Sequence, residues 1–224
     1  KLTIHTGAIN VPIVQTILPE AVVSADANLN YVTSIEKKQY SAVGIGPGLG
    51  CSVETEEALF DFIKQGDLKL VIDADGLNIL SKHYNWAKFL PKDTILTPHP
   101  GEWERMIGKH ADSTTQLRLA MDYAKLYGIY IILKGHYTAV CTPNGHVYFN
   151  VNGNSGMATA GSGDVLAGII LSLRCQGYSA LDACRLGVWL HGRAGDCAST
   201  KYGEHSMMAS DMIECLGDAF KTLM

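Results

Sequence analysis

Short apolar runs alternate with segments of helical periodicity along most of the chain. Five runs are predicted to be β-strands, and each ends close to a Gly, Pro, Asp or His residue: 2–5, 42–45, 70–72, 94–96 and 129–133. Apolar strands that alternate with helices are typical of a parallel sheet covered on both faces. The pattern therefore predicts an α/β protein with a mostly parallel central sheet.

Apolar positions between and after these strands recur three and four residues apart, which is the period of one helix face. The clearest stripes are Ala58, Leu59, Phe62 and Ile63; Leu117, Ala120, Met121 and Ala124; and Met212, Leu216, Ala219, Phe220 and Leu223. Ser113 and Gln116 have the spacing of a helix capping box. Residues 165–173 are apolar around nearly the whole helix circumference, so we expect this helix inside the domain and not at its surface.

The pattern changes after Lys134, where two short alternating runs, 138–142 and 147–150, flank the turn residues Pro143, Asn144 and Gly145. This arrangement predicts a small antiparallel hairpin. We find no internal repeat, low-complexity tract or linker. A chain of 224 residues is then expected to form a single domain, residues 1–224.

Composition excludes several classes of function. The chain has 18 Lys and Arg against 22 Asp and Glu, a formal net charge of −4, and no basic run, so neither nucleic acid nor an anionic membrane is an expected partner. Its longest apolar stretch, 165–171, is shorter than the roughly 18–20 residues that cross a bilayer. Six cysteines without a C-x-x-C pair, and no H-E-x-x-H motif, predict no protein-held metal and a reducing, cytosolic compartment.

Candidate chemistry is concentrated in residues 153–163 (GNSGMATAGSG), which contain four glycines and lead through Asp164 into the apolar helix. A glycine loop that opens a helix presents free N–H groups and the positive end of the helix dipole, which suit a phosphate. Asp164 could accept a hydrogen bond from a substrate hydroxyl and aim that hydroxyl at phosphorus. The alternative is that Asp164 only caps the helix and that the glycines form a tight turn.

Two better-known glycine motifs are absent. The P-loop pattern G-x-x-x-x-G-K-[ST] occurs nowhere in the chain. Gly44, Gly46, Gly48 and Gly50 follow a predicted strand, but the G-x-G-x-x-G dinucleotide motif fails in either register. These glycines are expected to let a ligand or a neighbouring backbone come close.

Polar side chains follow three predicted strands, and in open parallel sheets ligands bind outside the carboxyl ends of strands. These residues are Asp73, Asp75, Asn78, His99, Glu102 and Lys134. We expect them to converge on one site. Singly, each has a structural alternative: Asp75 as a helix cap, His99 in a turn between two prolines, and Lys134 at a solvated edge. His191, on an apolar helical segment, is expected to be a hydrogen-bonded core residue.

Several of these segments together resemble one enzyme family. They are GIGPGLG (44–50), VIDADGLN (71–78), LTPHPGEWERM (96–106), LKG (133–135) and NSGMATAGSGDVLAG (154–168). In this order and combination they closely resemble the ADP/ATP-dependent NAD(P)H-hydrate dehydratases of the ribokinase-like superfamily. The resemblance implies a three-layer sandwich with helices on both faces of the sheet.

The resemblance also implies a metabolite-repair reaction. The S epimer of NADH or NADPH hydrated at C6 of the nicotinamide would be dehydrated at the expense of ADP or ATP, releasing phosphate and AMP or ADP. Mg²⁺ would bridge the nucleotide phosphates. Two alternatives remain: a small-molecule kinase of the same superfamily, acting on a vitamin precursor or sugar alcohol, and a nucleotide-sensing module without catalysis.

Carried over residue by residue, the resemblance assigns Asp164 to orient or deprotonate the C6 hydroxyl, with Gly161 and Gly163 in an anion hole formed by backbone N–H groups. Gly48, His99 and Asp164 would contact the hydrated dinucleotide. The residues assigned to the adenine nucleotide are Lys134, Gly135, His136, Tyr137, Thr138 and Gly163.

This chain departs from the family pattern in two places. Relatives begin earlier, with a strand, a glycine-rich turn and a small-residue helix that help to bind substrate, and some carry an upstream epimerase domain. We therefore expect a missing N-terminal segment and a possible fused epimerase. Ser162 stands where relatives often have Met or Thr, with little expected consequence. Relatives often assemble as tetramers, so a homo-oligomer is expected.

Overall fold

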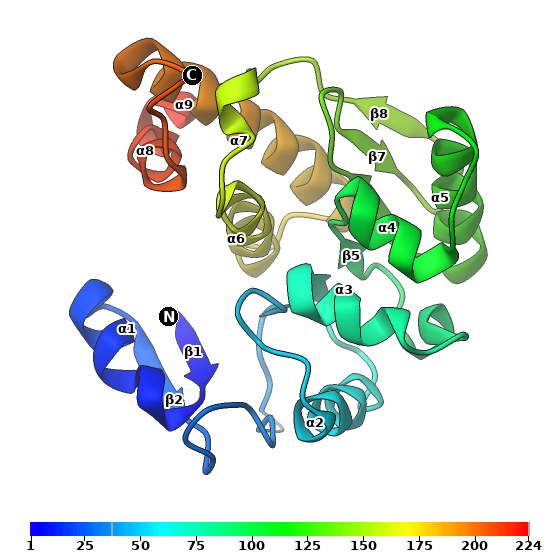
Figure 1. Cartoon of the computed structure of the whole chain (residues 1–224), viewed down its shortest axis with the longest axis vertical. Coiled ribbons are helices and arrows are strands. Elements are labelled where there is room, and N and C mark those ends of the chain that lie inside the picture. Colours follow the sequence, from blue (N-terminus) through cyan, green and yellow to red (C-terminus); the bar gives the residue numbers. More distant parts are fainter. Residues whose placement is uncertain (37, 224) are drawn as a thin grey trace.

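The computed structural model describes residues 1–36 and 38–223, and its centre is a six-stranded sheet of order β3-β4-β5-β6-β7-β8 (Figure 1). The first four strands are parallel, and β7 and β8 form the predicted antiparallel hairpin beside β6. The strands are β3 (Val43–Ile45), β4 (Leu70–Ile72), β5 (Ile95–Leu96), β6 (Tyr130–Leu133), β7 (Ala139–Cys141) and β8 (Val147–Phe149). The mixed α/β class with a mostly parallel central sheet is confirmed.

Helices cover both faces of the sheet. Alternate residues of each strand point to opposite sides, so each strand contributes apolar side chains to two cores. In β4, Leu70 and Ile72 belong to one core cluster and Val71 to the other. The first cluster includes side chains of α2 (Val53–Ile63), α3 (Ala74–Ser81), α4 (Pro100–Ile107) and α5 (Ser113–Tyr127). The second includes side chains of α6 (Ser162–Cys175), α7 (Ala180–Tyr202), α8 (Ala209–Glu214) and α9 (Leu216–Lys221). The predicted three-layer sandwich is confirmed.

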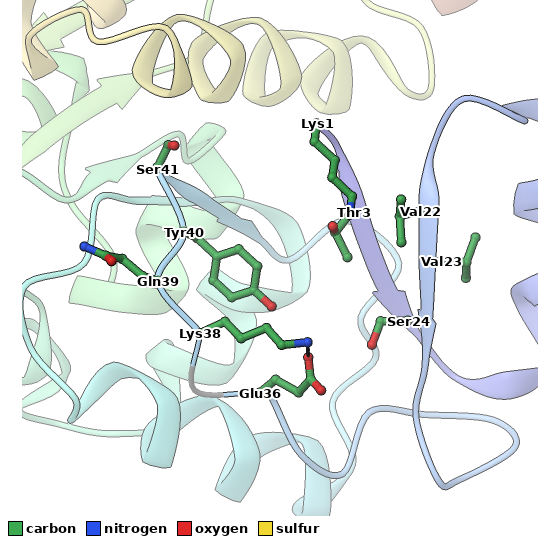
Figure 2. A pocket seen from close by; sticks show the side chains of 10 residues that line it. All are labelled: Lys1, Thr3, Val22, Val23, Ser24, Glu36, Lys38, Gln39, Tyr40 and Ser41. Carbon is green, nitrogen blue, oxygen red and sulfur yellow. Dashed lines mark ion pairs between the residues drawn. The ribbon is translucent and has the colours of Figure 1, made fainter.

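The first predicted strand pairs differently from the expectation. β1 (Thr3–Thr6) does not join the central sheet but forms a separate parallel pair with β2 (Val22–Ala25), joined to it through η1 (Ala8–Asn10) and α1 (Val11–Ile17). A cavity of about 670 Å³ separates β1 and β2 from Glu36 and residues 38–41, which precede β3. Figure 2 shows Lys1 and Thr3 on one side of this cavity and Tyr40 and Ser41 on the other.

Two details of the predicted helices are wrong. Asp112, and not Ser113, is the N-cap of α5, and its carboxylate accepts a hydrogen bond from the Thr115 N–H at 2.7 Å, so the Ser113–Gln116 capping box does not form. The last predicted stripe is divided between α8 and α9, which meet at Cys215. Met212 and Ala219 are buried, but Phe220 and Leu223 at its end are 42% and 51% exposed.

Helix α6 lies against the sheet, as its apolar sequence predicts, but one of its faces is open. Gly168 and Ser172 are exposed on this face, and a groove of about 450 Å³ runs beside them, bounded by Ile213 and Phe220 of the C-terminal helices. The expectation that α6 would be buried all round is therefore wrong for this strip. Among the described residues, no helix is both long and apolar enough to span a membrane.

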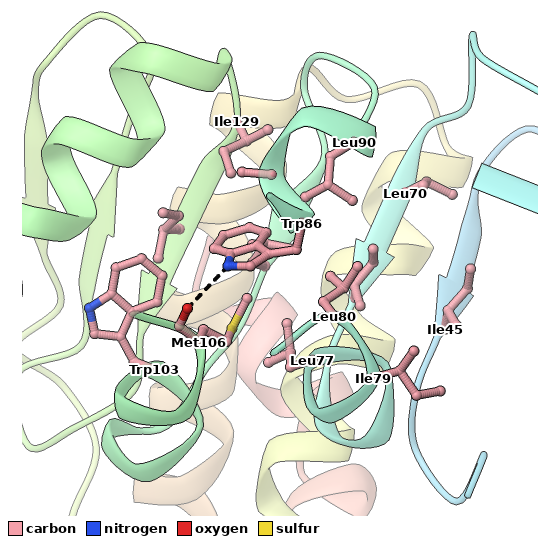
Figure 3. Close-up of a cluster of buried hydrophobic side chains, with 14 of the residues drawn as sticks. Ile45, Leu70, Leu77, Ile79, Leu80, Trp86, Leu90, Trp103, Met106 and Ile129 are labelled. Carbon is pink, nitrogen blue, oxygen red and sulfur yellow. Dashed lines mark hydrogen bonds between the residues drawn. The ribbon is translucent and has the colours of Figure 1, made fainter. Parts of the chain in front are cut away.

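The core beneath α4 and α5 depends on Trp86, in η2 (Trp86–Phe89), which is 2% exposed (Figure 3). Its indole N–H donates to the Met106 carbonyl at 3.2 Å, and its ring stacks on Tyr123 at 5.6 Å between centroids. Trp86→Ala should lower the free energy of unfolding by about 3–5 kcal/mol in urea titrations. Leu126→Ala, at a side chain 73% exposed, should change it by less than about 0.5 kcal/mol; equal effects would contradict this description of the core.

Candidate active site

Three of the polar residues predicted to converge do meet at the carboxyl ends of β4, β5 and β6. The Lys134 ammonium donates to Asp73 Oδ1 at 2.8 Å and lies 3.8 Å from Glu102 Oε2. Asp73 and Glu102 are almost fully buried, whereas the Lys134 side chain keeps 19% of its surface exposed. The alternative of Lys134 as a solvated edge residue is excluded, because its ammonium joins two buried carboxylates.

His99 and Glu102 cap the start of α4 reciprocally. The Nδ1 atom of His99 accepts from the Gly101 N–H at 3.0 Å and the Glu102 N–H at 3.3 Å, while Glu102 Oε2 accepts from the His99 N–H at 2.8 Å. This is a capping box built on a histidine. Because Nδ1 accepts, the neutral ring carries its proton on Nε2, which lies 3.5 Å from Glu102 Oε1; the imidazole as a whole is about half exposed.

Asp164 lies in the first turn of α6, beside the Asp73–Lys134 pair. The N-cap of α6 is Gly161, at φ +86°, so the alternative role of Asp164 as the helix cap is wrong. A Cβ atom on Gly163 would lie 3.0 Å from Lys134 Nζ and 3.6 Å from Asp73 Oδ2. The glycine thus allows the N-terminus of α6 to approach the ion pair closely.

The electrostatics of Asp164 reflect these neighbours. Asp164 is an exposed residue, yet its pKa is raised, chiefly by partial burial of its carboxyl group and then by the negative charge of Asp73, while Lys134 opposes the shift. No side chain caps α6, which leaves its first N–H groups without a side-chain acceptor among the described residues. A free helix N-terminus next to a carboxylate of raised pKa suits the binding of an anion and the acceptance of a proton.

The glycine loop after β3 also lies at this edge of the sheet. Gly46 adopts φ +134°, and a Cβ atom there would lie 1.7 Å from the Asp73 carbonyl oxygen, so the residue brings two backbones together as predicted. Gly48 adopts φ +65° and has open space around it. The Gly50 N–H donates to Asp75 Oδ2 at 2.9 Å, which places Asp75 in support of this loop and not at the N-cap of α3.

Gly46→Ala should prevent stable folding, because the added methyl group would overlap the carbonyl of Asp73, the residue that Lys134 contacts. We expect loss of the cooperative unfolding transition in circular dichroism. Gly66→Ala is the control: its φ is also positive, at +69°, but nothing lies within 4 Å of the new atom. A folded Gly46→Ala protein with unchanged melting temperature would contradict the packing described.

The segment predicted to hold a nucleotide connects β6 and β7 on the same side. Beyond Lys134, Gly135 has open space around it, and Thr138 donates through its hydroxyl to the Gly135 carbonyl at 3.2 Å. The rings of His136 and Tyr137 meet edge to face at 4.4 Å, and Tyr137 is 61% exposed. No group of three His, Cys, Asp or Glu side chains in the described part of the chain is arranged to hold a metal ion.

Comparison with known proteins decides the family. A family model described as NAD(P)H-hydrate dehydratase matches residues 1–217. The chain belongs to the NAD(P)H-hydrate dehydratase family. An ADP-dependent (S)-NAD(P)H-hydrate dehydratase from Neisseria meningitidis is 39% identical over 201 residues, which cover 84% of this chain and 67% of that protein.

A longer relative of this dehydratase family is the bifunctional NAD(P)H-hydrate repair enzyme Nnr from Thermofilum pendens, 36% identical over 201 residues. The match covers 89% of this chain but only 38% of that enzyme, so the chain spans well under half the length of such relatives.

Solved structures agree with the family. An ADP/ATP-dependent NAD(P)H-hydrate dehydratase from Bacillus subtilis, co-crystallized with ATP/Mg²⁺, superposes with a TM-score of 0.85 at 28% identity, over 100% of this chain and 79% of that one. A ribokinase-like superfamily protein from Enterococcus faecalis V583 gives 0.80 at 25% identity, over 98% and 76%. The ribokinase-like fold of this dehydratase-family chain is thereby established.

Two features of the site were not among the residues predicted to act. Asp73 and Glu102 were expected to converge on the site but were assigned no role there, and they are the partners of Lys134. Their position beyond the ends of strands was the signal. His191 hydrogen-bonds to Ser162 at the start of α6. No spacing rule connects residues on two different helices, so the sequence held no signal for this contact.

Proposed function

We propose that this protein uses ADP or ATP to dehydrate the S epimer of hydrated NADH or NADPH, releasing phosphate and AMP or ADP. The observation that carries the proposal is the position of Asp164: it stands on the uncapped first turn of α6, next to the Asp73–Lys134 pair. Membership of the dehydratase family, and the names and nucleotide of its relatives, support the same reaction.

The proposed reaction has two steps. The C6 hydroxyl oxygen attacks the terminal phosphorus of the nucleotide, Asp164 accepts the hydroxyl proton, and the bond between that phosphorus and its bridging oxygen breaks, so that AMP or ADP leaves. The C6–O bond of the phosphate ester then breaks with loss of a proton from C5, which restores the ring double bond and frees phosphate. The raised pKa of Asp164 favours its acceptance of a proton.

Charge in the first step would be balanced by the chain and by Mg²⁺. N–H groups of Gly161 and Gly163 would donate to the transferring phosphoryl group, and the Lys134 ammonium would lie on the same side. Asp73 and Glu102 already contact Lys134, and no three-ligand metal group exists among the described residues. Mg²⁺, which neutralises phosphate charge, would therefore be held mainly by the nucleotide and by water.

We assign the two ligands to opposite sides of Asp164. The hydrated dinucleotide would contact Gly48, which has open space around it, and His99, whose imidazole is half exposed. The adenine nucleotide would lie along Lys134, Gly135, His136, Tyr137 and Thr138 and against Gly163. The exposure of Tyr137 and the open surroundings of Gly135 support this second assignment.

We propose further that residues 1–224 belong to one ribokinase-like domain. A further parallel strand, supplied by the N-terminal segment that relatives have, would lie between β1 and β3. The cavity between β1 and the residues that precede β3, and the unpaired edges of β1 and β3 in the described part of the chain, support this strand. The length of the bifunctional relatives supports a fused epimerase domain. Six free thiols support a reducing, cytoplasmic location.

Assembly into a homo-oligomer, a tetramer by resemblance, is part of the proposal. Ile9, Ile13 and Ile17 recur every four residues on one side of the α1 region and are 50%, 54% and 76% exposed. An exposed apolar stripe of this kind supports a contact between copies. Light scattering of the purified protein would measure the assembly, and a monomer at all concentrations would contradict it.

The proposed function is tested with the full-length gene product, hydrated NADH, ADP or ATP, and Mg²⁺. We expect recovery of the absorbance of the reduced nicotinamide and release of phosphate. If neither nucleotide restores the absorbance, the proposal is wrong. Stable phosphorylation of a vitamin precursor or sugar alcohol, without phosphate release, would instead identify a kinase; binding of nucleotide without either reaction would identify a sensing module.

A further inference from the structure

His191, on α7, contacts the first turn of α6 from behind the candidate anion hole. Its Nε2 atom lies 2.9 Å from the Ser162 carbonyl oxygen and 3.2 Å from the Ser162 hydroxyl. A carbonyl oxygen only accepts, so the imidazole must carry its proton on Nε2 and donate it. Ser162 stands between Gly161 and Gly163, the two glycines assigned to the anion hole. The imidazole therefore holds the one residue that joins them.

The imidazole is also held neutral. Burial lowers the pKa of His191 to about 4; the hydrogen bond to Ser162 opposes this shift, and the charge of Lys134 adds to it. The ring thus donates one fixed hydrogen bond without placing a second cation beside Lys134. An exposed surface histidine would not have this property, because its ordinary pKa lies near neutrality.

Helix α7 holds the beginning of the same glycine-rich segment through other residues. The Asn152 side chain donates to the Trp189 carbonyl at 2.9 Å. The Asp196 carboxylate accepts from the Gly153 N–H and from the Asn154 side chain, both at 3.2 Å. The segment is therefore fixed to α7 at its start, and His191 fixes it at its end.

Close approach of α7 to this segment depends on two glycines. A Cβ atom at Gly192 would lie 2.2 Å from Asn152 Oδ1, and one at Gly195 would lie 2.3 Å from Met157 Sδ. A side chain at Gly192 would overlap Asn152, including its backbone oxygen, and one at Gly195 would displace the Met157 side chain, so the backbone of α7 packs directly against the loop. His191 is the side chain that extends from this rigid support to the turn that begins α6.

We propose that His191 is a positioning residue for phosphoryl transfer: by holding the Ser162 carbonyl it orients the Ser162–Gly163 peptide, and so the direction of the Gly163 N–H beside the Gly161 N–H. The inference rests on the proposed function, because those N–H groups matter only if a phosphoryl group passes there. A displacement of about 1 Å in such a group can cost about a hundredfold in rate. His191 itself contacts no reacting atom in this scheme.

The test compares His191→Leu with His191→Gln, whose side-chain amide can donate from nearly the position of Nε2. In the Leu variant kcat should fall about tenfold to a hundredfold, with KM for hydrated NADH changed less than about threefold. The Gln variant should recover kcat to within about fivefold of wild type. His83→Leu, which removes a histidine bonded to Glu56 away from the site, serves as the matched control and should keep full turnover.

A second measurement does not depend on activity. Amide hydrogen exchange at residues 161–165 should be faster in His191→Leu than in wild type and near wild type in His191→Gln. If wild-type protein turns over and the Leu variant matches it in kcat and exchange, the positioning role is wrong. If both variants lose activity and melting temperature equally, His191 is only structural. If wild type has no turnover, the proposed function fails, and exchange alone still tests the contact.

Discussion

Asp164→Asn should lower kcat by about a hundredfold to ten-thousandfold while nucleotide affinity stays within about threefold of wild type. The amide retains the shape of the side chain but does not accept the hydroxyl proton. Nucleotide binding persists because the N–H groups of the first turn of α6, and Lys134, are unchanged. Turnover would be followed by the absorbance of reduced nicotinamide, and affinity by calorimetry with ADP or ATP and Mg²⁺.

The stability of this variant provides an internal check. Because the folded protein raises the pKa of Asp164, it disfavours the ionised carboxylate; the native state therefore loses stability as pH rises above the unfolded-state value. The neutral amide has no such penalty, so at pH 7 the variant should melt at or above the wild-type temperature. Asp218→Asn, at an exposed residue paired with Lys221, is the control. Equal loss of turnover and nucleotide binding would show that Asp164 is structural.

Lys134→Met should lower the free energy of unfolding by about 3–5 kcal/mol and weaken nucleotide binding by more than about tenfold. The substitution removes the ammonium that Asp73 contacts at 2.8 Å and leaves two nearly buried carboxylates, Asp73 and Glu102, without their cation. The same charge is assigned to the nucleotide phosphates, so binding and stability should fall together. Chemical denaturation and calorimetry measure the two effects.

Two comparisons separate this ion pair from an ordinary surface charge. Lys201→Met removes a lysine 3.8 Å from Glu214, with both side chains more than half exposed, and should cost less than about 0.5 kcal/mol. Asp73→Asn combined with Lys134→Met should recover part of the lost stability, because one uncompensated buried charge is gone. A Lys134→Met protein as stable as wild type would contradict the buried network.

The sequence predicted those strands whose residues are buried, because burial requires apolar residues at these positions. The four parallel strands of the central sheet are short apolar runs, because helices cover both faces of the sheet, and all four were found within a residue or two of their predicted bounds, as were the two strands of the hairpin. The strand β2 was not predicted: Val22–Ala25 is short and partly exposed, so packing places little demand on its sequence. For the same reason the sequence did not show that β1 pairs with β2 and not with the central sheet.

The candidate site was predictable to the extent that topology determines it. Asp73, Glu102 and Lys134 each follow a strand, and parallel strands bring their carboxyl ends to one edge, so their convergence follows from the strand assignments. Contacts between helices have no such rule. The bond between His191 and Ser162 depends on how α7 packs against α6, and this packing leaves no pattern along the chain. The glycines at 44–50 did predict a close approach of backbone, but not that Asp73 would be the partner of Gly46.

The central claim is that the terminal phosphate of an adenine nucleotide lies at the N-terminus of α6, facing Asp164. A crystal structure of the full-length protein with ADP or ATP and Mg²⁺ tests it most directly. We predict phosphate oxygens within hydrogen-bond distance of the N–H groups of Gly161 and Gly163, with the purine near Tyr137. A nucleotide bound with its phosphates away from this turn, and out of reach of Lys134, would contradict the account.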